Sequence, residues 1–266
     1  MPATYDLGGD GPPLLLAHAT GFHGRVWLPV VEHLRDRFRC IAFDERGHGD
    51  TRTPPGETFE WQHFADDVLA VVDAWGLDRL VGAGHSCGGA ALIMAELARP
   101  GTFGALWCYE PIVVPVDPPP PPSHDNPLTI GARRRREVFP SRQDALDNFA
   151  AKPPFDALAR DALVAYVEHG FDDLPDGAVR LKCRRDDEAE VYAHGFSHGT
   201  FGRFPDVGCP VHIACGERTD AMTPELITAQ AAAIPKGSTE VIPRLGHFGP
   251  LQDPAAIAAS IVRALG

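Results

Sequence analysis

Short apolar runs and longer amphipathic stretches alternate in the first and last parts of the chain. The short runs predict strands over residues 14–17, 40–43, 80–84, 105–109, 211–215 and 239–242. The amphipathic stretches predict helices over residues 26–37, 61–75, 88–98, 224–234 and 254–264. Such an alternation is typical of a mostly parallel sheet with helices on both faces, so we expect an α/β fold.

The alternation stops after Glu110. Asp117 is followed by a run of prolines at 118–122, and no strand pattern returns before Val211. Proline runs favour stiff, extended connectors, and the segment beyond this one predicts helices over 141–150, 156–169 and 187–194. We therefore expect a core of residues 1–110 and 206–266, with a helical cap of residues 111–205. The alternative is a helical insertion that never contacts the substrate.

Composition and charge narrow the class of protein. With 44% hydrophobic and 23% charged residues, the chain has the composition of a soluble globular protein, and its 266 residues suit one domain with an insertion. A formal net charge of −12 disfavours nucleic acid and anionic membranes, so a small-molecule substrate is expected. The absence of a spanning apolar run or a signal-peptide pattern at Met1 to Asp6 predicts a cytoplasmic protein. The oligomeric state stays open.

Metal ligands are not arranged in a recognisable pattern. The 6 cysteines are scattered without a C-x-x-C pair, and none of the 12 histidines has the H-E-x-x-H spacing. We therefore expect no disulfide framework and no metal site.

The segment Gly84-His85-Ser86-Cys87-Gly88 contains a G-x-S-x-G match between a predicted strand and a predicted helix. A tight turn in this context needs small residues on both sides, and it directs the serine out at the helix N-terminus. Ser86 is therefore the candidate nucleophile. A glycine-rich turn with a capping serine is the structural alternative.

A serine that attacks a carbonyl needs two backbone donors for the oxyanion. The N–H of Cys87 is the first candidate. The loop after the strand at 14–17 should supply the second, from Thr20 or, less favourably, Phe22. We expect His18 to support this loop by hydrogen bonding.

The chain resembles the α/β-hydrolase family with a cap domain over nearly its whole length. The run His18-Ala19-Thr20-Gly21 is similar to the family's His-Gly oxyanion loop, although alanine replaces the usual first glycine. Residues 43–51 resemble the D-x-R-G-x-G-x-S segment. The resemblance implies structural roles for Asp44, Arg46 and His48.

The resemblance also implies the other catalytic groups. The run from Gly246 to Pro254 is similar to the family's G-H-x-x-x-x-E-x-P segment, which makes His247 the general base. Residues 215–224 resemble the acid loop G-x-x-D-x-x-x-P with one extra residue, which favours Asp220 as the acid. Glu110 and Glu217 are the alternatives for the acid. If Glu110 is not the acid, it lines the pocket or bonds to the backbone.

These residues predict a serine hydrolase that cleaves a small carboxylic ester through an acyl-enzyme, without metal or cofactor. A lactone, a thioester or a C–C bond beside a carbonyl are alternative substrates for the same triad. A perhydrolase and a non-enzymatic receptor for a small ligand are alternative functions. The cap residues 133–136 are all arginine; they form either a solvated face or, for one or two of them, a contact to a substrate carboxylate.

Overall fold

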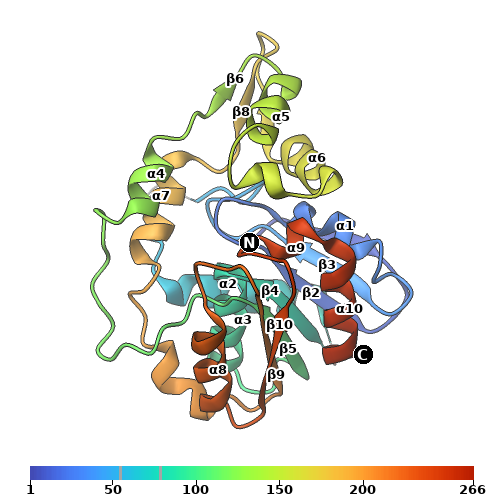
Figure 1. Cartoon of the computed structure of the whole chain (residues 1–266), viewed down its shortest axis with the longest axis vertical. Helices are drawn as coiled ribbons and strands as arrows, with labels where there is room; N and C mark the ends of the chain where they lie inside the picture. The colour runs from blue at the N-terminus through green and yellow to red at the C-terminus, as the bar shows by residue number, and fades with distance from the viewer. Residues whose placement is uncertain (54–55, 78–79) are drawn as a thin grey trace.

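The computed structural model describes residues 1–53, 56–77 and 80–266 and contains a seven-stranded sheet. Its strand order is β1-β3-β2-β4-β5-β9-β10 (Figure 1). The strands from β3 to β10 pair in parallel, whereas β1 pairs antiparallel with β3. The strands are β1 Thr4–Gly8, β2 Pro13–Ala17, β3 Arg39–Phe43, β4 Val81–His85, β5 Ala105–Tyr109, β9 Val211–Gly216 and β10 Gly237–Ile242.

Each strand expected from an apolar run is present within two residues of its predicted ends. The edge strand β1 was not predicted. Its residues are half-buried or exposed, so no apolar run marks it. A register shift between Asp6 and Gly8 further breaks any regular alternation.

Helices cover both faces of the sheet. On one face lie α2 (Trp61–Trp75), α3 (Cys87–Ala98) and α8 (Pro224–Ala233), and on the other α1 (Leu28–Val31) and α10 (Pro254–Leu265), as Figure 1 shows. Each face buries its own apolar cluster, with Leu15 in one and Leu16 in the other. Consecutive strand residues therefore face opposite layers, as expected for a parallel sheet buried on both sides.

The helix expected over 26–37 was wrong in its extent. A 3₁₀ turn, η1 (Gly24–Trp27), leads into the single turn of α1. The following residues mix i to i−3 bonds, from His33 N to Val30 O and from Leu34 N to Val31 O, with an i to i−4 bond from Arg35 N to Val31 O. The apolar face is present, but the mixed bonding does not continue as a regular α-helix.

The segment between β5 and β9 forms an insertion at the top of Figure 1 and along its left side. It was expected to be helical, but it also contains a three-stranded antiparallel sheet of order β6-β8-β7. These strands are only two or three residues long, too short to give a strand pattern. The elements are α4 Pro127–Arg133, β6 Val138–Phe139, α5 Arg142–Ala150, η2 Phe155–Ala157, α6 Arg160–His169, β7 Phe171–Asp173, β8 Val179–Leu181, α7 Arg185–His194 and η3 Thr200–Asp206.

The insertion packs against the loops that follow the strands. Helix α6 contacts η1, α1 and α9 (Gly249–Gln252). The ring of Phe22 lies 5.8 Å from Phe155, 5.3 Å from Tyr166 and 5.7 Å from Phe248, measured between ring centroids. This aromatic cluster joins the insertion to the carboxyl end of the sheet. The exact division into core and cap stays a prediction.

Within the described ranges, no helix combines the length and the apolar character needed to cross a bilayer.

Candidate active site

Ser86 lies at the sharp turn between β4 and α3. Its backbone has φ 55° and ψ −113°, an uncommon conformation for a residue with a side chain. A Cβ added to Gly84 would lie 2.6 Å from the Gly89 nitrogen, and one added to Gly88 would lie 2.6 Å from the Ala17 carbonyl carbon. Both glycines of the G-x-S-x-G run are therefore required by close packing of the backbone.

The imidazole of His247 is hydrogen-bonded to a buried carboxylate. Its Nδ1 lies 2.6 Å from Oε2 of Glu110, whose side chain is fully buried. The same oxygen accepts from the hydroxyl of Thr219 at 2.7 Å, and Oε1 accepts from the backbone N–H of Gly216 at 3.0 Å. Three donors therefore hold the carboxylate in one orientation. This leaves Nε2 as the ring nitrogen of His247 that can receive a proton.

The carboxylate that contacts His247 is not the one expected from the sequence. Asp220, the favoured candidate, is exposed, and within the described part of the chain it makes no hydrogen bond to His247. Glu217 is also exposed and accepts from the backbone N–H of Arg244 at 2.9 Å. The extra residue in this loop explains the difference, because the turn places Thr219, and not Asp220, against Glu110. Glu110 was weighed only as an alternative.

A charged residue directly after a buried strand was the signal for Glu110 in the sequence. Its backbone has a positive φ of 48°, and its N–H donates to Ala214 O of the neighbouring strand. That conformation turns the side chain at the strand end, where the loops carrying Thr219 and His247 also lie. Thr219 was not singled out from the sequence, although counted from Gly216 it stands at the acid's place in G-x-x-D.

The loop that carries His247 is fixed by core residues. The hydroxyl of Tyr109 donates to Gly246 O at 2.7 Å, and His85 Nε2 lies 2.8 Å from His247 O. Since His85 directly precedes Ser86, its side chain joins the serine turn to the backbone of the histidine loop. No hydrogen bond between the Ser86 hydroxyl and His247 is present among the described residues. Catalytic contacts of this kind are often loose without substrate.

The loop after β2 lies beside the serine turn, because Gly88 N donates to His18 O at 3.2 Å. The N–H of Phe22 donates to Ala19 O, and that of Gly21 donates to Nε2 of His48 at 2.9 Å. The N–H of Thr20 has no such partner within residues 1–53, 56–77 and 80–266. Of the two expected donors, Thr20 is therefore the one left free.

Two buried histidines support this loop. His18 Nε2 accepts from Glu45 N at 3.0 Å, so its Nδ1 carries the proton and donates to Ala19 O at 2.8 Å. His48 Nε2 accepts from Gly21, so its Nδ1 donates to Arg46 O. Burial lowers the pKa of His18 to about 4 and that of His48 to about 3. Both rings are neutral at neutral pH and serve as fixed supports.

Asp44 and Arg46 also make structural contacts, as expected. Asp44 accepts from the backbone N–H groups of Gly24 and Asp50, each at 2.7 Å. Arg46 binds both carboxylate oxygens of Asp67, at 2.8 and 2.9 Å. These contacts tie the segment after β3 to its neighbours.

Of the four consecutive arginines in the insertion, three are exposed and one is turned inward. Arg133, Arg134 and Arg136 are exposed. Arg135 is turned inward, where its guanidinium pairs with the buried Glu188 of α7 and donates to the Tyr166 hydroxyl at 2.6 Å. Its charge is therefore compensated within the insertion. Gly21 packs against this ion pair, since a Cβ added there would lie 2.7 Å from Glu188 Oε1.

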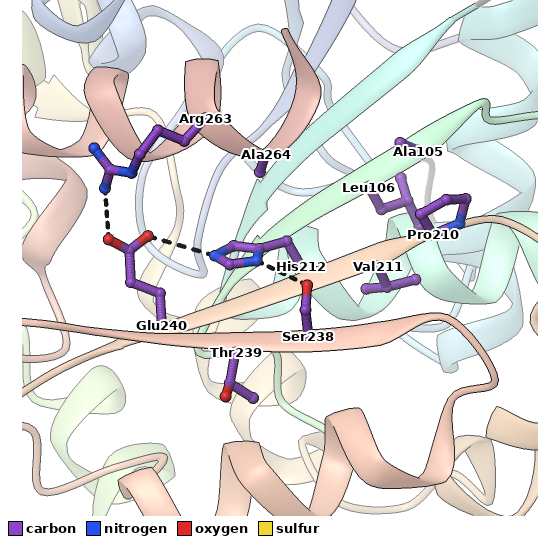
Figure 2. Close-up of a pocket in the computed structure, with 10 residues that line it drawn as sticks. All are labelled: Ala105, Leu106, Pro210, Val211, His212, Ser238, Thr239, Glu240, Arg263 and Ala264. Atoms are coloured by element: carbon purple, nitrogen blue, oxygen red, sulfur yellow. Dashed lines mark hydrogen bonds and ion pairs between the residues drawn. The ribbon is translucent and has the colours of Figure 1, made fainter.

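A cavity of about 440 Å³ opens elsewhere, at the amino ends of β5, β9 and β10 (Figure 2). Its side chains include a hydroxyl, an imidazole and a carboxylate: His212 lies 2.9 Å from Ser238 through Nδ1 and 3.4 Å from Glu240 through Nε2. Ser238 is exposed on an ordinary strand, without a helix N-terminus behind it. The strained turn and backbone donors of Ser86 have no counterpart here. The carboxyl end of the sheet is also where ligands bind in open α/β folds.

The described ranges contain no group of three or more His, Cys, Asp or Glu side chains able to hold a metal ion.

Comparison with known proteins gives consistent results. A curated hydrolase from Mesorhizobium japonicum, named 2-(acetamidomethylene)succinate hydrolase, is 25% identical over 241 residues, covering 90% of this chain and 83% of its own. Haloalkane dehalogenase 2 of Mycobacterium tuberculosis is 34% identical over 106 residues, which are 38% of this chain and only 37% of that protein. The crystal structure of an E-2-(acetamidomethylene)succinate hydrolase superposes with a TM-score of 0.81 at 21% identity, covering 100% of this chain and 98% of the other.

The profile of the family described as "Alpha/beta hydrolase family" matches residues 14–260. This range includes the serine turn, the insertion and the histidine loop. The fold, the strained serine turn and the sequence match agree, and the chain belongs to the α/β-hydrolase family.

Proposed function

We propose that this protein is a serine hydrolase that cleaves small carboxylic esters, with Ser86 as nucleophile, His247 as general base and Glu110 as the acid. The observation that carries the proposal is the hydrogen bond from His247 Nδ1 to the buried carboxylate of Glu110. A histidine oriented in this way beside a strained serine turn is the arrangement that acyl transfer requires.

In the first half of the reaction, His247 Nε2 takes the proton of the Ser86 hydroxyl as its oxygen attacks the ester carbonyl. The imidazolium is stabilised by Glu110, which keeps the proton on Nδ1 and the ring in place. The N–H groups of Cys87 and Thr20 bind the oxyanion of the tetrahedral intermediate. His247 then protonates the departing alkoxide and leaves an acyl group on Ser86.

In the second half, His247 removes a proton from water, which attacks the acyl carbonyl in the same oxyanion site. Collapse of this intermediate releases the acid and returns the proton to Ser86. The N-terminus of α3 supports both steps, since Cys87 is its first residue and its dipole favours negative charge there.

The identity of residue 86 argues against dehalogenation. Haloalkane dehalogenases are among the relatives matched over part of the chain. Those enzymes attack with an aspartate, whose carboxylate forms the ester intermediate. Ser86 has no carboxylate, so it supports acyl transfer instead.

The test is steady-state turnover of short p-nitrophenyl esters by the native chain and by Ser86→Ala and His247→Ala. Each variant should lose at least about a thousandfold in kcat, since triad members act as a unit. Circular dichroism should show that both variants fold. A residual rate within tenfold of native for Ser86→Ala would remove Ser86 from the mechanism.

An amide bond is a second candidate target for the same three residues. The curated relative that aligns over 90% of this chain is named 2-(acetamidomethylene)succinate hydrolase. Parallel assays with that compound and with p-nitrophenyl acetate would show whether the protein prefers an amide or an ester bond. A kcat/KM at least tenfold higher for the amide would reassign the preferred bond.

A further inference from the structure

A buried carboxyl group lies directly behind the proposed oxyanion site. Glu45 is 1% exposed and sits in the segment after β3. Its Oε2 accepts from the thiol of Cys87 at 3.1 Å. Its Oε1 is buried and has no hydrogen-bond partner among the described residues. A carboxylate with a single weak donor is poorly solvated, so its charged form is disfavoured there.

The charge of Arg46 offsets this burial only in part, and its effect on the pKa of Glu45 is smaller than that of Asp67. The guanidinium of Arg46 points away and binds both oxygens of Asp67 on α2. His18 presents an accepting nitrogen to the Glu45 backbone, so its ring is neutral. Asp67 and Asp44 add like charge, and the Cys87 thiol gives only a weak donor. Burial, the dominant cause, raises the pKa of Glu45 to about 8.

Glu45 is linked to both proposed oxyanion donors. Its carboxyl binds the side chain of Cys87, whose backbone N–H is the first donor. The side chain of Thr20, whose N–H is the second proposed donor, lowers the pKa of the same thiol. The backbone of Glu45 also holds His18, at the start of the Thr20 loop. A change in the charge of this carboxyl therefore affects the surroundings of both N–H groups.

We propose that neutral Glu45 is a positioning residue for the oxyanion site, and that its ionisation slows the hydrolase in alkaline solution. An ionised Glu45 places a negative charge behind the two N–H groups that must stabilise an oxyanion. In a buried site water screens this charge poorly, so the repulsion lowers the rate on the order of tenfold or more. The inference rests on the proposed serine hydrolase function.

The experiment compares pH profiles of kcat between pH 6 and pH 10 for the native chain and for Glu45→Gln. The native kcat should fall above neutral pH with a midpoint near the pKa of Glu45, about 8. Glutamine keeps the size and an accepting oxygen but cannot ionise. Its profile should lose this fall, even if its kcat at pH 7 is a few-fold lower. A Glu45→Gln profile with the native midpoint would overturn the proposal.

A second variant keeps the test decisive if Glu45→Gln does not fold. Cys87→Ala removes the thiol donor but retains the backbone N–H. Loss of that donor disfavours the ionised carboxylate, so the alkaline midpoint should move to higher pH. An unmoved midpoint would contradict the proposal. Glu57→Gln is the matched control, because Glu57 contacts the outer side of Arg46 and is half exposed; its midpoint should equal the native one.

The two proposals fail in different ways. Absence of turnover for every ester and amide tested would count against the proposed function. Turnover that depends on Ser86 and His247, with an alkaline fall that both Glu45→Gln and Cys87→Ala leave unchanged, would remove Glu45 alone.

Discussion

Oε2 of Glu110 lies 2.6 Å from Nδ1 of His247, although 137 positions separate the two residues along the chain. The carboxylate comes from the end of β5, whereas the histidine follows β10. Its remaining contacts, to Gly216 and Thr219, come from the loop after β9. Three consecutive strands of the sheet thus meet at this one carboxyl group.

Replacement of Glu110 by glutamine tests which acid supports His247. The amide cannot accept from Nδ1–H through its nitrogen, so the imidazole loses its preferred tautomer. We expect kcat for a p-nitrophenyl ester to fall by about a thousandfold to ten-thousandfold. Asp220→Asn is the matched control and should change kcat by less than about threefold, since Asp220 is exposed and does not contact His247. The reverse ranking of the two variants would restore Asp220 as the acid.

Acid should destabilise this protein between about pH 6.5 and pH 4. Burial lowers the pKa of His18 to about 4, of His23 to about 3 and of His48 to about 3, and burial also lowers that of His85. In the unfolded chain these groups take up protons near pH 6.5, while the folded chain cannot, so the free energy of unfolding falls as the pH falls. Urea unfolding at a series of pH values measures this slope.

Variants of single histidines show which of them contribute to the pH dependence of the free energy of unfolding. His48→Gln should reduce the slope by up to about 1.4 kcal/mol per pH unit, because one fewer proton is taken up on unfolding. His63 is 41% exposed, and His63→Gln should leave the slope nearly unchanged. Equal slopes for native and His48→Gln would show that His48 is charged in the folded state.

Gly21 is constrained by both its backbone and its neighbours. It has φ +84°, and an added Cβ would lie 2.7 Å from Glu188 Oε1. Gly101 has nearly the same φ, +83°, but nothing lies within 4 Å of an added Cβ. Gly101→Ala should therefore cost only the backbone strain, about 1 kcal/mol, whereas Gly21→Ala should cost more.

The same pair of variants should differ in activity. Displacement of Gly21 moves the N–H of Thr20, the proposed oxyanion donor, so kcat/KM should fall by about tenfold to a hundredfold in Gly21→Ala alone. Thermal unfolding and ester turnover measure the two effects. If both variants lose the same stability and neither loses activity, close packing of Gly21 against Glu188 does not matter for activity.

The buried pair Arg135–Glu188 should be strongly coupled. Its side chains are 18% and 5% exposed. Arg135→Met or Glu188→Gln alone leaves one polar partner buried, so each should lower the free energy of unfolding by about 3 kcal/mol or more. The double variant should be far less damaging than the sum of the two. A double-mutant cycle in urea gives the coupling energy.

An exposed ion pair provides the comparison for that cycle. Arg99 and Asp73 are 2.7 Å apart, with side chains 41% and 64% exposed. Water screens this pair, so its coupling should stay below about 1 kcal/mol. A coupling of the same size for Arg135–Glu188 would mean that the inner pair is also well hydrated.

The sequence by itself determined the parts of this protein that depend on neighbours along the chain. The apolar runs placed the parallel strands, and the pattern of α2 gave Trp61–Trp75 without error. The serine turn followed from Gly84 and Gly88, because local backbone crowding excludes larger residues there. His247 followed from a short segment similar to that of the family.

Only the tertiary structure decided which carboxylate faces His247, which arginine turns inward and that Glu45 lies against Cys87. These contacts join segments far apart in the sequence, so no local pattern records them. One extra residue in the loop at 216–220 was enough to exchange Asp220 for Thr219 beside Glu110. Spacing along the chain fixes the backbone of a strand or a turn, whereas the partner of a side chain depends on how separate loops meet at the end of the sheet.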